Sequence, residues 1–231
     1  MRTALTAALL LSLAVAVPPA GADIFLADFT GYDWTWPIAN QLDAVGQYYE
    51  LNSTVGTVNP AYITADFTNN EYTLIIGNDL FYNGADHFGT TTIAHYINGD
   101  IEIYEDSRST GSAATYNLDS LCDPFYDRLT FIDGTLILSG TFSSFDIIFD
   151  TVSGDGNLAG FTNWSGGTQI GNIPANQRNG WTLGAIGIRT GTTPCGYHWQ
   201  VDGNCVLEEP VPTKRTTWGA IKSDPGFTLD H

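Results

Sequence analysis

The sequence predicts an all-β protein, an antiparallel two-sheet sandwich of the jelly-roll or lectin-like type that forms one domain. Short stretches of alternating apolar and polar residues recur between turns rich in Gly, Asn and Asp. No stretch keeps a 3.6-residue apolar period, and no strand–helix alternation occurs. The 25 glycines and the 13% of aromatic residues indicate many tight turns around a well-filled core. A closed barrel is the second choice.

Two-residue turns between alternating segments predict four β-hairpins, because such turns fix which residues face each other. The turn dipeptides are Asn69-Asn70, Asn98-Gly99, Asp133-Gly134 and Asp202-Gly203. The first would place Ile63, Ala65 and Phe67 on one face with Tyr72, Leu74 and Ile76. Apolar patterning predicts further strands at residues 24–29, 48–58, 145–149, 158–164 and 181–188.

Residues 1–22 have the pattern of a signal peptide. Arg2 precedes an apolar stretch over residues 4–17, and Ala20-Gly21-Ala22 is a small-x-small cleavage site. The apolar stretch has about 14 residues, fewer than the roughly 20 of a membrane span. No later segment is long and apolar enough, so we expect no transmembrane segment after cleavage. The chain is therefore expected to be secreted or held at the surface of a bacterium.

The mature chain divides into a β-sandwich domain over residues 23–207 and a linker with a short tail over residues 208–231. The linker begins with two glutamates and alternates proline with valine, and the tail contains Lys214, Arg215 and Lys222. The whole chain has a net charge of −17, which argues against nucleic-acid binding, since phosphate backbones are bound by clustered basic residues. Only 14% of residues are charged, which excludes highly charged disorder.

Several segments occur in an order typical of a known group of proteins. They are Asn70-Glu71-Tyr72-Thr73, IEIYED (101–106), TFIDGTLILSG (130–140), GNLAGFTNWSGG (156–167), GYHWQVDG (196–203) and PVPTKRTTWGAIK (210–222). With them the chain resembles uncharacterised secreted β-rich proteins of environmental bacteria that end in a Thr-Thr-Trp-Gly-x-Ile-Lys tail. The resemblance covers most of the mature chain and implies export, but it implies no activity, ligand or catalytic residue. Residues 223–231 extend beyond the tail of that group.

The chain has three cysteines, so at least one is unpaired within the chain. A bridge between Cys195 and Cys205 would close a short loop. The Asp202-Gly203 turn, however, pairs Cys205 with Gln200, and a straight strand would hold Cys195 about 16 Å away. A turn near Cys195 could restore that bridge, and a bridge from Cys122 to either of the others is the alternative.

Two kinds of ligand site are predicted. Tyr32, Trp34 and Trp36 alternate with polar residues after the first strand, and in a loop they would form a glycan-binding rim, although they could instead cap the core. Asp150, Asp155 and Asn157 lie in a glycine-containing turn and could bind Ca²⁺ through oxygen atoms. Asp and Asn also form turns without any ion.

A catalytic interpretation depends on the Asn98-Gly99 hairpin. That turn would place His95 opposite Glu102, with Asp106 further along the same face. The function expected first is a non-catalytic glycan- or calcium-binding or adhesion module that binds a glycan or a cell-surface component. The alternative is a secreted polysaccharide hydrolase that uses Glu102 with Asp106 or His95. On a solvent-facing sheet surface, however, His and Glu more often form an ordinary cross-strand pair, and this is the preferred interpretation of His95 and Glu102.

Overall fold

A computed structural model describes residues 23–189 and 192–208 of the chain. The predicted signal peptide and the tail from residue 209 lie outside the described residues. The strands are β1 (Ile24–Trp36), β2 (Tyr48–Val58), β3 (Asn70–Gly77), β4 (Phe81–Phe88), β5 (Thr91–Ile97), β6 (Asp100–Ser107), β7 (Thr135–Asp150), β8 (Gly156–Gly166), β9 (Trp181–Ile188) and β10 (Gln200–Leu207). The helical segments are α1 (Pro124–Arg128), η1 (Ile170–Asn172) and η2 (Ala175–Gln177).

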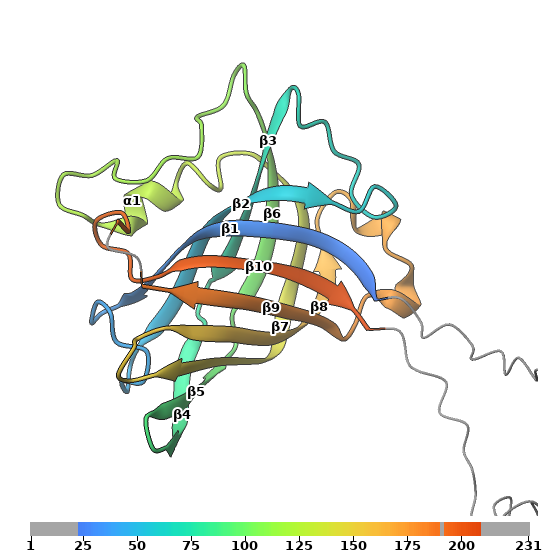
Figure 1. Cartoon of the computed structure of the whole chain (residues 1–231). Helices are drawn as coiled ribbons and strands as arrows, with labels where there is room; N and C mark the ends of the chain where they lie inside the picture. The colour runs from blue at the N-terminus through green and yellow to red at the C-terminus, as the bar shows by residue number, and fades with distance from the viewer. Residues whose placement is uncertain (1–22, 190–191, 209–231) are drawn as a thin grey trace, which may run out of the picture. The chain divides into compact units, whose positions relative to one another are not determined.

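The strands form a closed antiparallel barrel, so the predicted two-sheet sandwich, jelly-roll or lectin-like, is wrong (Figure 1). Eight strands follow one another round the barrel in the order β1, β2, β3, β6, β7, β8, β9 and β10, and β4 and β5 are extra strands. The first and last strands pair from Ile24↔Leu207 to Tyr32↔Gln200. Alternating polarity shows that a strand has one buried face, but closure depends on this pairing between distant segments, which no local pattern encodes.

Strands β3 to β6 form one long hairpin with a bend in each arm, because β3 pairs with β6 and β4 pairs with β5. The Asn98-Gly99 dipeptide is the bend in the second arm, with φ values of 62° and 80°. On both sides of it the chain keeps the same register against β7, with Tyr96 opposite Phe145 and Asp100 opposite Thr141. The predicted hairpin turn at this dipeptide is therefore wrong.

The other three predicted hairpins are also wrong. Asp202-Gly203 lies inside β10, where a Cβ on Gly203 would be 2.4 Å from the Cβ of Ala185, so glycine here permits close strand packing. The segment before Asp133-Gly134 contains α1 and forms no strand that could pair with β7. At Asn69-Asn70, β3 pairs with β2 and β6 and does not pair with residues 63–67. The strands predicted from apolar patterning at residues 24–29, 48–58, 145–149, 158–164 and 181–188 are confirmed.

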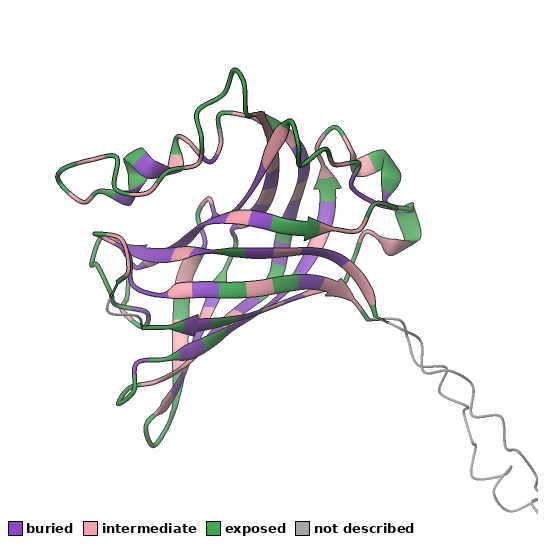
Figure 2. Ribbon diagram, turned by 45° about the horizontal axis from the view of Figure 1, so that its top comes forward, coloured by how far each residue is buried: buried purple, intermediate pink, exposed green. Residues whose placement is uncertain are grey.

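Large aromatic side chains fill the barrel, and Figure 2 shows buried residues along every side of it. The indole of Trp199 is fully buried near one end and packs over two glycines on neighbouring strands. A Cβ at Gly187 would lie 2.3 Å from this indole, and a Cβ at Gly156 would lie 2.7 Å from it. These glycines make room for the tryptophan.

The segment of residues 108–134, called the flap below, lies over the outer face of β1 and β2 (Figure 1). It contains α1, which begins at Pro124 after the N-cap Asp123. The ring of Phe125 contacts Trp34 at a centroid distance of 5.4 Å, and the hydroxyl of Tyr116 donates to a backbone oxygen of β2. Residues of β1 and β2 are consequently buried on both faces.

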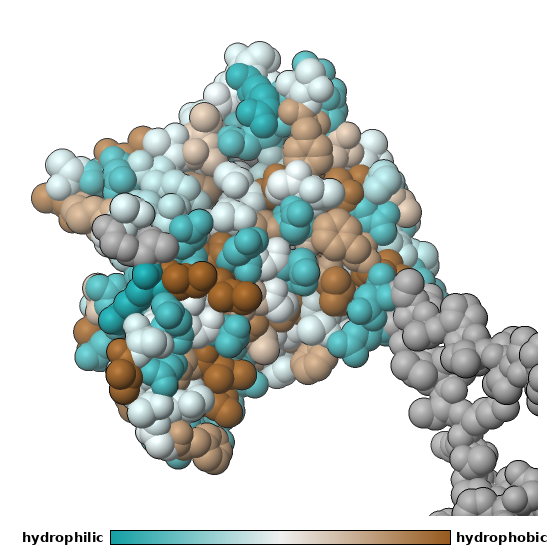
Figure 3. All heavy atoms as spheres, viewed as in Figure 1, coloured by the Kyte–Doolittle hydropathy of each residue, from teal (hydrophilic) through white to brown (hydrophobic). Residues whose placement is uncertain are grey.

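The rest of the outer surface is mixed in character. Phe161, Ile186 and Ile188 are exposed apolar residues on β8 and β9. In Figure 3 apolar side chains occur in small groups between hydrophilic ones on the viewed face. This mixture is usual for strands with one face toward the core and one toward water.

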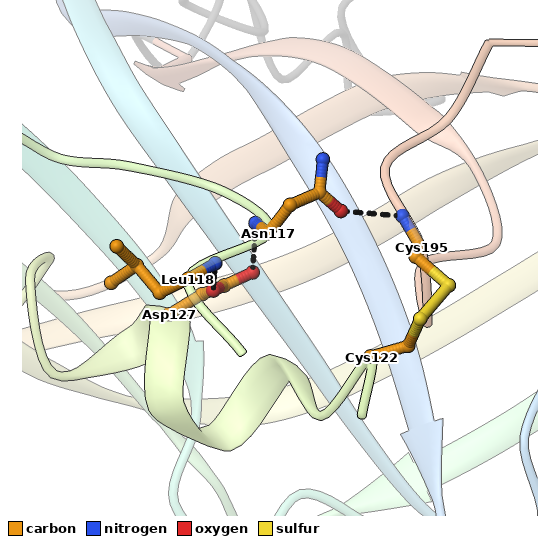
Figure 4. The surroundings of a disulfide bond; sticks show 5 residues. All are labelled: Asn117, Leu118, Cys122, Asp127 and Cys195. Atoms are coloured by element: carbon orange, nitrogen blue, oxygen red, sulfur yellow. Dashed lines mark hydrogen bonds between the residues drawn. A yellow bond between two sulfur atoms is a disulfide. The ribbon is translucent and has the colours of Figure 1, made fainter. Parts of the chain in front are cut away.

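A disulfide joins Cys122 in the flap to Cys195 in the loop between β9 and β10, with a Cα–Cα distance of 5.0 Å (Figure 4). The amide oxygen of Asn117 accepts a hydrogen bond from the backbone of Cys195. Beside it, the carboxylate of Asp127 accepts the N–H groups of two flap residues. Cys205 is buried in β10 without a bridge. Of the alternatives above, the structure has the Cys122–Cys195 pair.

We expect Gly187→Ala to lower the free energy of unfolding by about 1–3 kcal/mol, because the new methyl group would overlap the Trp199 indole. Gly184→Ala, on the same strand, is the control, because nothing lies within 4 Å of its Cβ position. Denaturant unfolding of both variants measures the difference. Equal stability of the two variants would show that Trp199 is not packed against Gly187.

We expect a thiol reagent to leave the native protein unlabelled and to label a single cysteine, Cys205, after denaturation without reductant. The reason is that Cys205 is buried and the other two cysteines are bridged. Mass spectrometry of proteolytic peptides locates the label and the bridge. Labelling of Cys122 or Cys195 in the oxidised chain would contradict the assignment.

Candidate functional site

A cavity of about 320 Å³ lies at the barrel end opposite the Ile24–Leu207 pair. Three loops meet there: residues 37–47 between β1 and β2, residues 151–155 between β7 and β8, and the loop between β9 and β10, of which Arg189 and His198 line the cavity. The lining residues are Asn40, Gln41, Leu42, Asp43, Ala44, Phe149, Asp150, Thr151, Gly154, Arg189, His198 and Trp199. Trp199 is fully buried at the cavity, and most of the other lining residues are polar.

The loop of residues 37–47 is held in place by buried groups. The side-chain amide of Gln47 is fully buried and hydrogen-bonds with both the N–H and the carbonyl of Ile38. The hydroxyl of Tyr96, which points up from the barrel core, donates to the carbonyl of Leu42 at 2.6 Å. These contacts fix the backbone that carries Asn40 and Asp43 at the cavity.

Arg189 follows the last residue of β9 and lies against the backbone of Gly154. A Cβ at Gly154 would be 2.9–3.1 Å from the Cδ, Nε and Cζ atoms of the arginine, so glycine leaves the space that this side chain occupies. The Nη2 and Nε atoms of Arg189 donate to Nε2 of His198 at 2.9 and 3.3 Å. The guanidinium is therefore fixed at the cavity by a ring nitrogen and by close packing.

These contacts determine the tautomer of His198. An arginine has only donors, so Nε2 of the imidazole must accept, and the ring hydrogen is on Nδ1. Nδ1 lies 3.9 Å from Oδ2 of Asp33, which is beyond hydrogen-bond distance. The order from the cavity toward the core is thus arginine, neutral imidazole and carboxyl group.

Asp33 lies in β1 with its side chain inside the barrel, and none of its surface is exposed. Its Oδ1 accepts the backbone N–H of Trp199, but Oδ2 has no hydrogen-bond partner among the described residues. Burial raises the pKa of Asp33, and the neighbouring His198 opposes that effect. Burial and, second, the Asp33 charge raise the pKa of Tyr49, whose hydroxyl has no hydrogen-bond partner within the described part of the chain. A partly unpartnered acid in a hydrophobic core is unfavourable, and such groups concentrate at functional sites.

The predicted glycan-binding residues Tyr32, Trp34 and Trp36 lie in strand β1, and the expected loop is absent. They point to the outer face, opposite to Asp33. The indole of Trp34 is 3% exposed beneath Phe125 in the flap, and Trp36 stacks on Tyr48. Tyr32 packs against Tyr116 and Tyr197. The three rings bind the flap to the barrel, and they form no exposed rim.

Of the predicted calcium-binding residues, Asp150 and Asp155 accept hydrogen bonds from protein groups. Oδ1 of Asp150 accepts the N–H groups of Val152 and Ser153, and Oδ2 accepts the hydroxyl of Thr90 at 2.6 Å. Asp155 accepts the backbone N–H of Arg189 at 3.0 Å, and Asn157 lies exposed in β8. Across the described part of the chain no three His, Cys, Asp or Glu residues are placed to hold a metal ion.

His95 lies in β5 between two carboxylates. Its Nδ1 is 2.7 Å from Oδ1 of Asp146, and its Nε2 is 3.3 Å from Oδ2 of Asp86. The hydrogen bond to Asp146 raises the pKa of His95. His95 is not opposite Glu102, because the two residues lie along one bent strand and face different positions of β7.

Glu102 and Asp106 make separate local contacts in β6. Oε2 of Glu102 accepts the side-chain amide of Asn78 at 3.1 Å and the hydroxyl of Tyr104 at 3.0 Å. Asp106 accepts the backbone N–H of Ser107. The structure therefore does not bring His95, Glu102 and Asp106 together as one catalytic group.

Glu50 in β2 is a buried acid that the sequence did not single out. Its side chain is 6% exposed under the flap, with Oε2 3.4 Å from Nε of Arg128. Burial raises the pKa of Glu50 to about 7, with Arg128 opposing the shift and the charges of Asp79 and Glu102 adding to it. An alternating strand predicts an outward side chain here, but it does not show that a distant segment covers it.

The raised pKa of Glu50 predicts a pH-dependent stability. The unfolded chain releases this proton near pH 4.5 and the folded chain near pH 7, so this contribution is complete below pH 4.5 and is lost as the pH rises to 7. Relative to Glu50→Gln, the natural protein should lose on the order of 3 kcal/mol over that range. Denaturant unfolding at several pH values measures it.

Glu208→Gln, at an exposed residue near the end of β10, is the matched control and should keep the pH slope of the natural protein. If the Glu50→Gln variant keeps that slope as well, Glu50 does not titrate as described.

The fold and the site together define a filled, closed antiparallel barrel with a polar cavity at one end. Comparisons with protein families, with curated protein sequences and with solved structures give no match for this chain. The resemblance to secreted β-rich bacterial proteins stays a prediction. No helix within the described residues combines the length and the apolar character that a bilayer crossing requires.

Proposed function

We propose that the protein is an exported, non-catalytic binding protein whose barrel-end cavity binds one or two sugar units of a glycan. The observation that carries this proposal is the cavity of about 320 Å³, framed by three loops and the Asp33–His198–Arg189 series. Cavities of this size at the mouths of β-barrels are common ligand sites. The glycan expected from the sequence is thus assigned to a different place from Tyr32, Trp34 and Trp36.

The lining suits a sugar. Asn40, Gln41 and Asp43 supply amide and carboxylate groups that can bond with hydroxyl groups, and Thr151 adds a hydroxyl on the opposite loop. Phe149, which is partly exposed, supplies apolar surface for the C–H groups of a pyranose ring. This combination of few apolar groups with several convergent polar groups fixes the orientation of a small ligand.

The alternative of a polysaccharide hydrolase has less support, because His95, Glu102 and Asp106 make separate contacts. We therefore propose binding without hydrolysis.

The test is calorimetric titration of residues 23–231 with a panel of neutral and acidic mono- to trisaccharides, with and without a chelator. We expect at least one sugar to bind, with no effect of the chelator. Ala44→Trp should weaken that binding about tenfold or more by filling the cavity. Ala113→Trp, at an exposed flap residue, is the control and should bind as the natural protein does.

The proposal fails if no sugar of the panel binds, or if Ala44→Trp binds as tightly as Ala113→Trp. It also fails if a bound oligosaccharide is cleaved during the titration.

A further inference from the structure

We infer that the bound sugar carries a carboxylate, as a uronic acid does, and that Arg189 binds this group while His198 and Asp33 act as positioning residues. This inference rests on the proposed function and names the ligand class of the same cavity. Three observations support it: the packing and hydrogen bonds of Arg189, the His198 and Asp33 side chains behind it, and the different partners of the other described arginines.

The arginines of the described residues have different partners, and lysine is absent from this part of the chain. Arg128 is paired with Glu50, Arg178 donates to two backbone carbonyls, and Arg108 donates to one. Arg189 has no carboxylate within ion-pair distance among the described residues, and it donates to the neutral His198. Its positive charge is therefore available to a ligand at the cavity.

The guanidinium is also preoriented. It lies on Gly154, it is fixed through Nε and Nη2, and Nη1 makes no hydrogen bond with the described residues. A guanidinium held on one edge presents the donors of its other edge as a fork, which matches the two oxygens of a carboxylate. A neutral sugar would leave this fork partly unused.

His198 and Asp33 explain how the arginine keeps this orientation. The imidazole is 4% exposed, stacks on Trp199 at a centroid distance of 4.8 Å and accepts a hydrogen bond from Arg189. Asp33 lies behind it with an unpartnered Oδ2 facing Nδ1 at 3.9 Å. A carboxyl group there favours the tautomer with hydrogen on Nδ1, which keeps Nε2 free to accept. Neither residue is required to touch the ligand.

Two acidic residues of the lining, Asp150 and Asp43, would repel an anionic ligand. Both oxygens of Asp150 accept hydrogen bonds within its own turn and from Thr90, and these bonds lower its pKa. Asp43 is exposed on the facing loop, where its carboxylate can accept sugar hydroxyls. A ligand carboxylate at Arg189 would be repelled by Asp43, so Asp43→Asn should strengthen the binding of an acidic sugar.

The test compares a trimer of galacturonic acid with its methyl ester and with a neutral galactose trimer, by calorimetry at low salt. We expect the acid to bind the natural protein about tenfold or more tightly than the ester, as a charge-assisted contact implies. Arg189→Gln should abolish this preference and keep weak binding of the ester. Arg108→Gln, which changes an exposed arginine outside the cavity, should keep the preference.

The positioning role is tested by a conservative rescue. His198→Gln retains an acceptor for Arg189 and should keep part of the preference for the acid, whereas His198→Leu should lose it. Nitrogen-15 NMR of the Arg189 Nε–H group in both variants reports whether the guanidinium is still held. If both variants keep the full preference, His198 does not position Arg189.

The inference fails if the acid and its ester bind equally, or if Arg189→Gln keeps the preference for the acid. In either case binding of the neutral trimer still supports the proposed function. If none of the three trimers binds, the inference and this form of the proposed function both fail.

Discussion

Pairing between the two ends of the described chain is the interaction on which the rest of this structure depends. Strand β10 lies beside β1 over its whole length, from Leu207 at one end to Gln200 at the other, and β1 also pairs with β2. This closes the eight barrel strands around the aromatic core. It also brings His198 and Trp199, which directly precede β10, against Asp33 in β1. The pairing that closes the barrel therefore also brings together the residues of the cavity.

Strand positions could be predicted from the sequence to a greater extent than their arrangement. The bounds of β2 and β9 agree with the apolar pattern, because one face of each packs on a core. Turn dipeptides were the misleading signal. Asn98-Gly99 adopts the positive φ angles of a hairpin turn but bends a strand, and Gly203 relieves crowding inside a strand. A local motif specifies local dihedral angles, whereas the partner of a strand depends on the whole sheet.

Sequence patterns could not predict the candidate site, for a related reason. Arg189, His198 and Asp33 come from separate parts of the chain and meet only across the closed barrel. One signal was present: the alternation of Tyr32, Trp34 and Trp36 is typical of a strand, and in a strand Asp33 must face the other way. If these rings are placed in a loop, nothing predicts that the Asp33 carboxyl group lies inside the barrel. Glu50 gave no comparable signal, because its burial depends on the flap.

The disulfide between the flap and the loop that precedes His198 has a consequence for the thermodynamics of recognition. Cys195 is bonded to Cys122, and the facing loop is fixed through Gln47 and Tyr96. The described residues on both sides of the cavity are therefore held by contacts within the chain. A ligand that enters such a cavity has little loop entropy to remove, so even a few polar contacts can yield a measurable affinity. In the proposed binding protein, the covalent link would contribute to affinity through preorganisation, although neither cysteine lines the cavity.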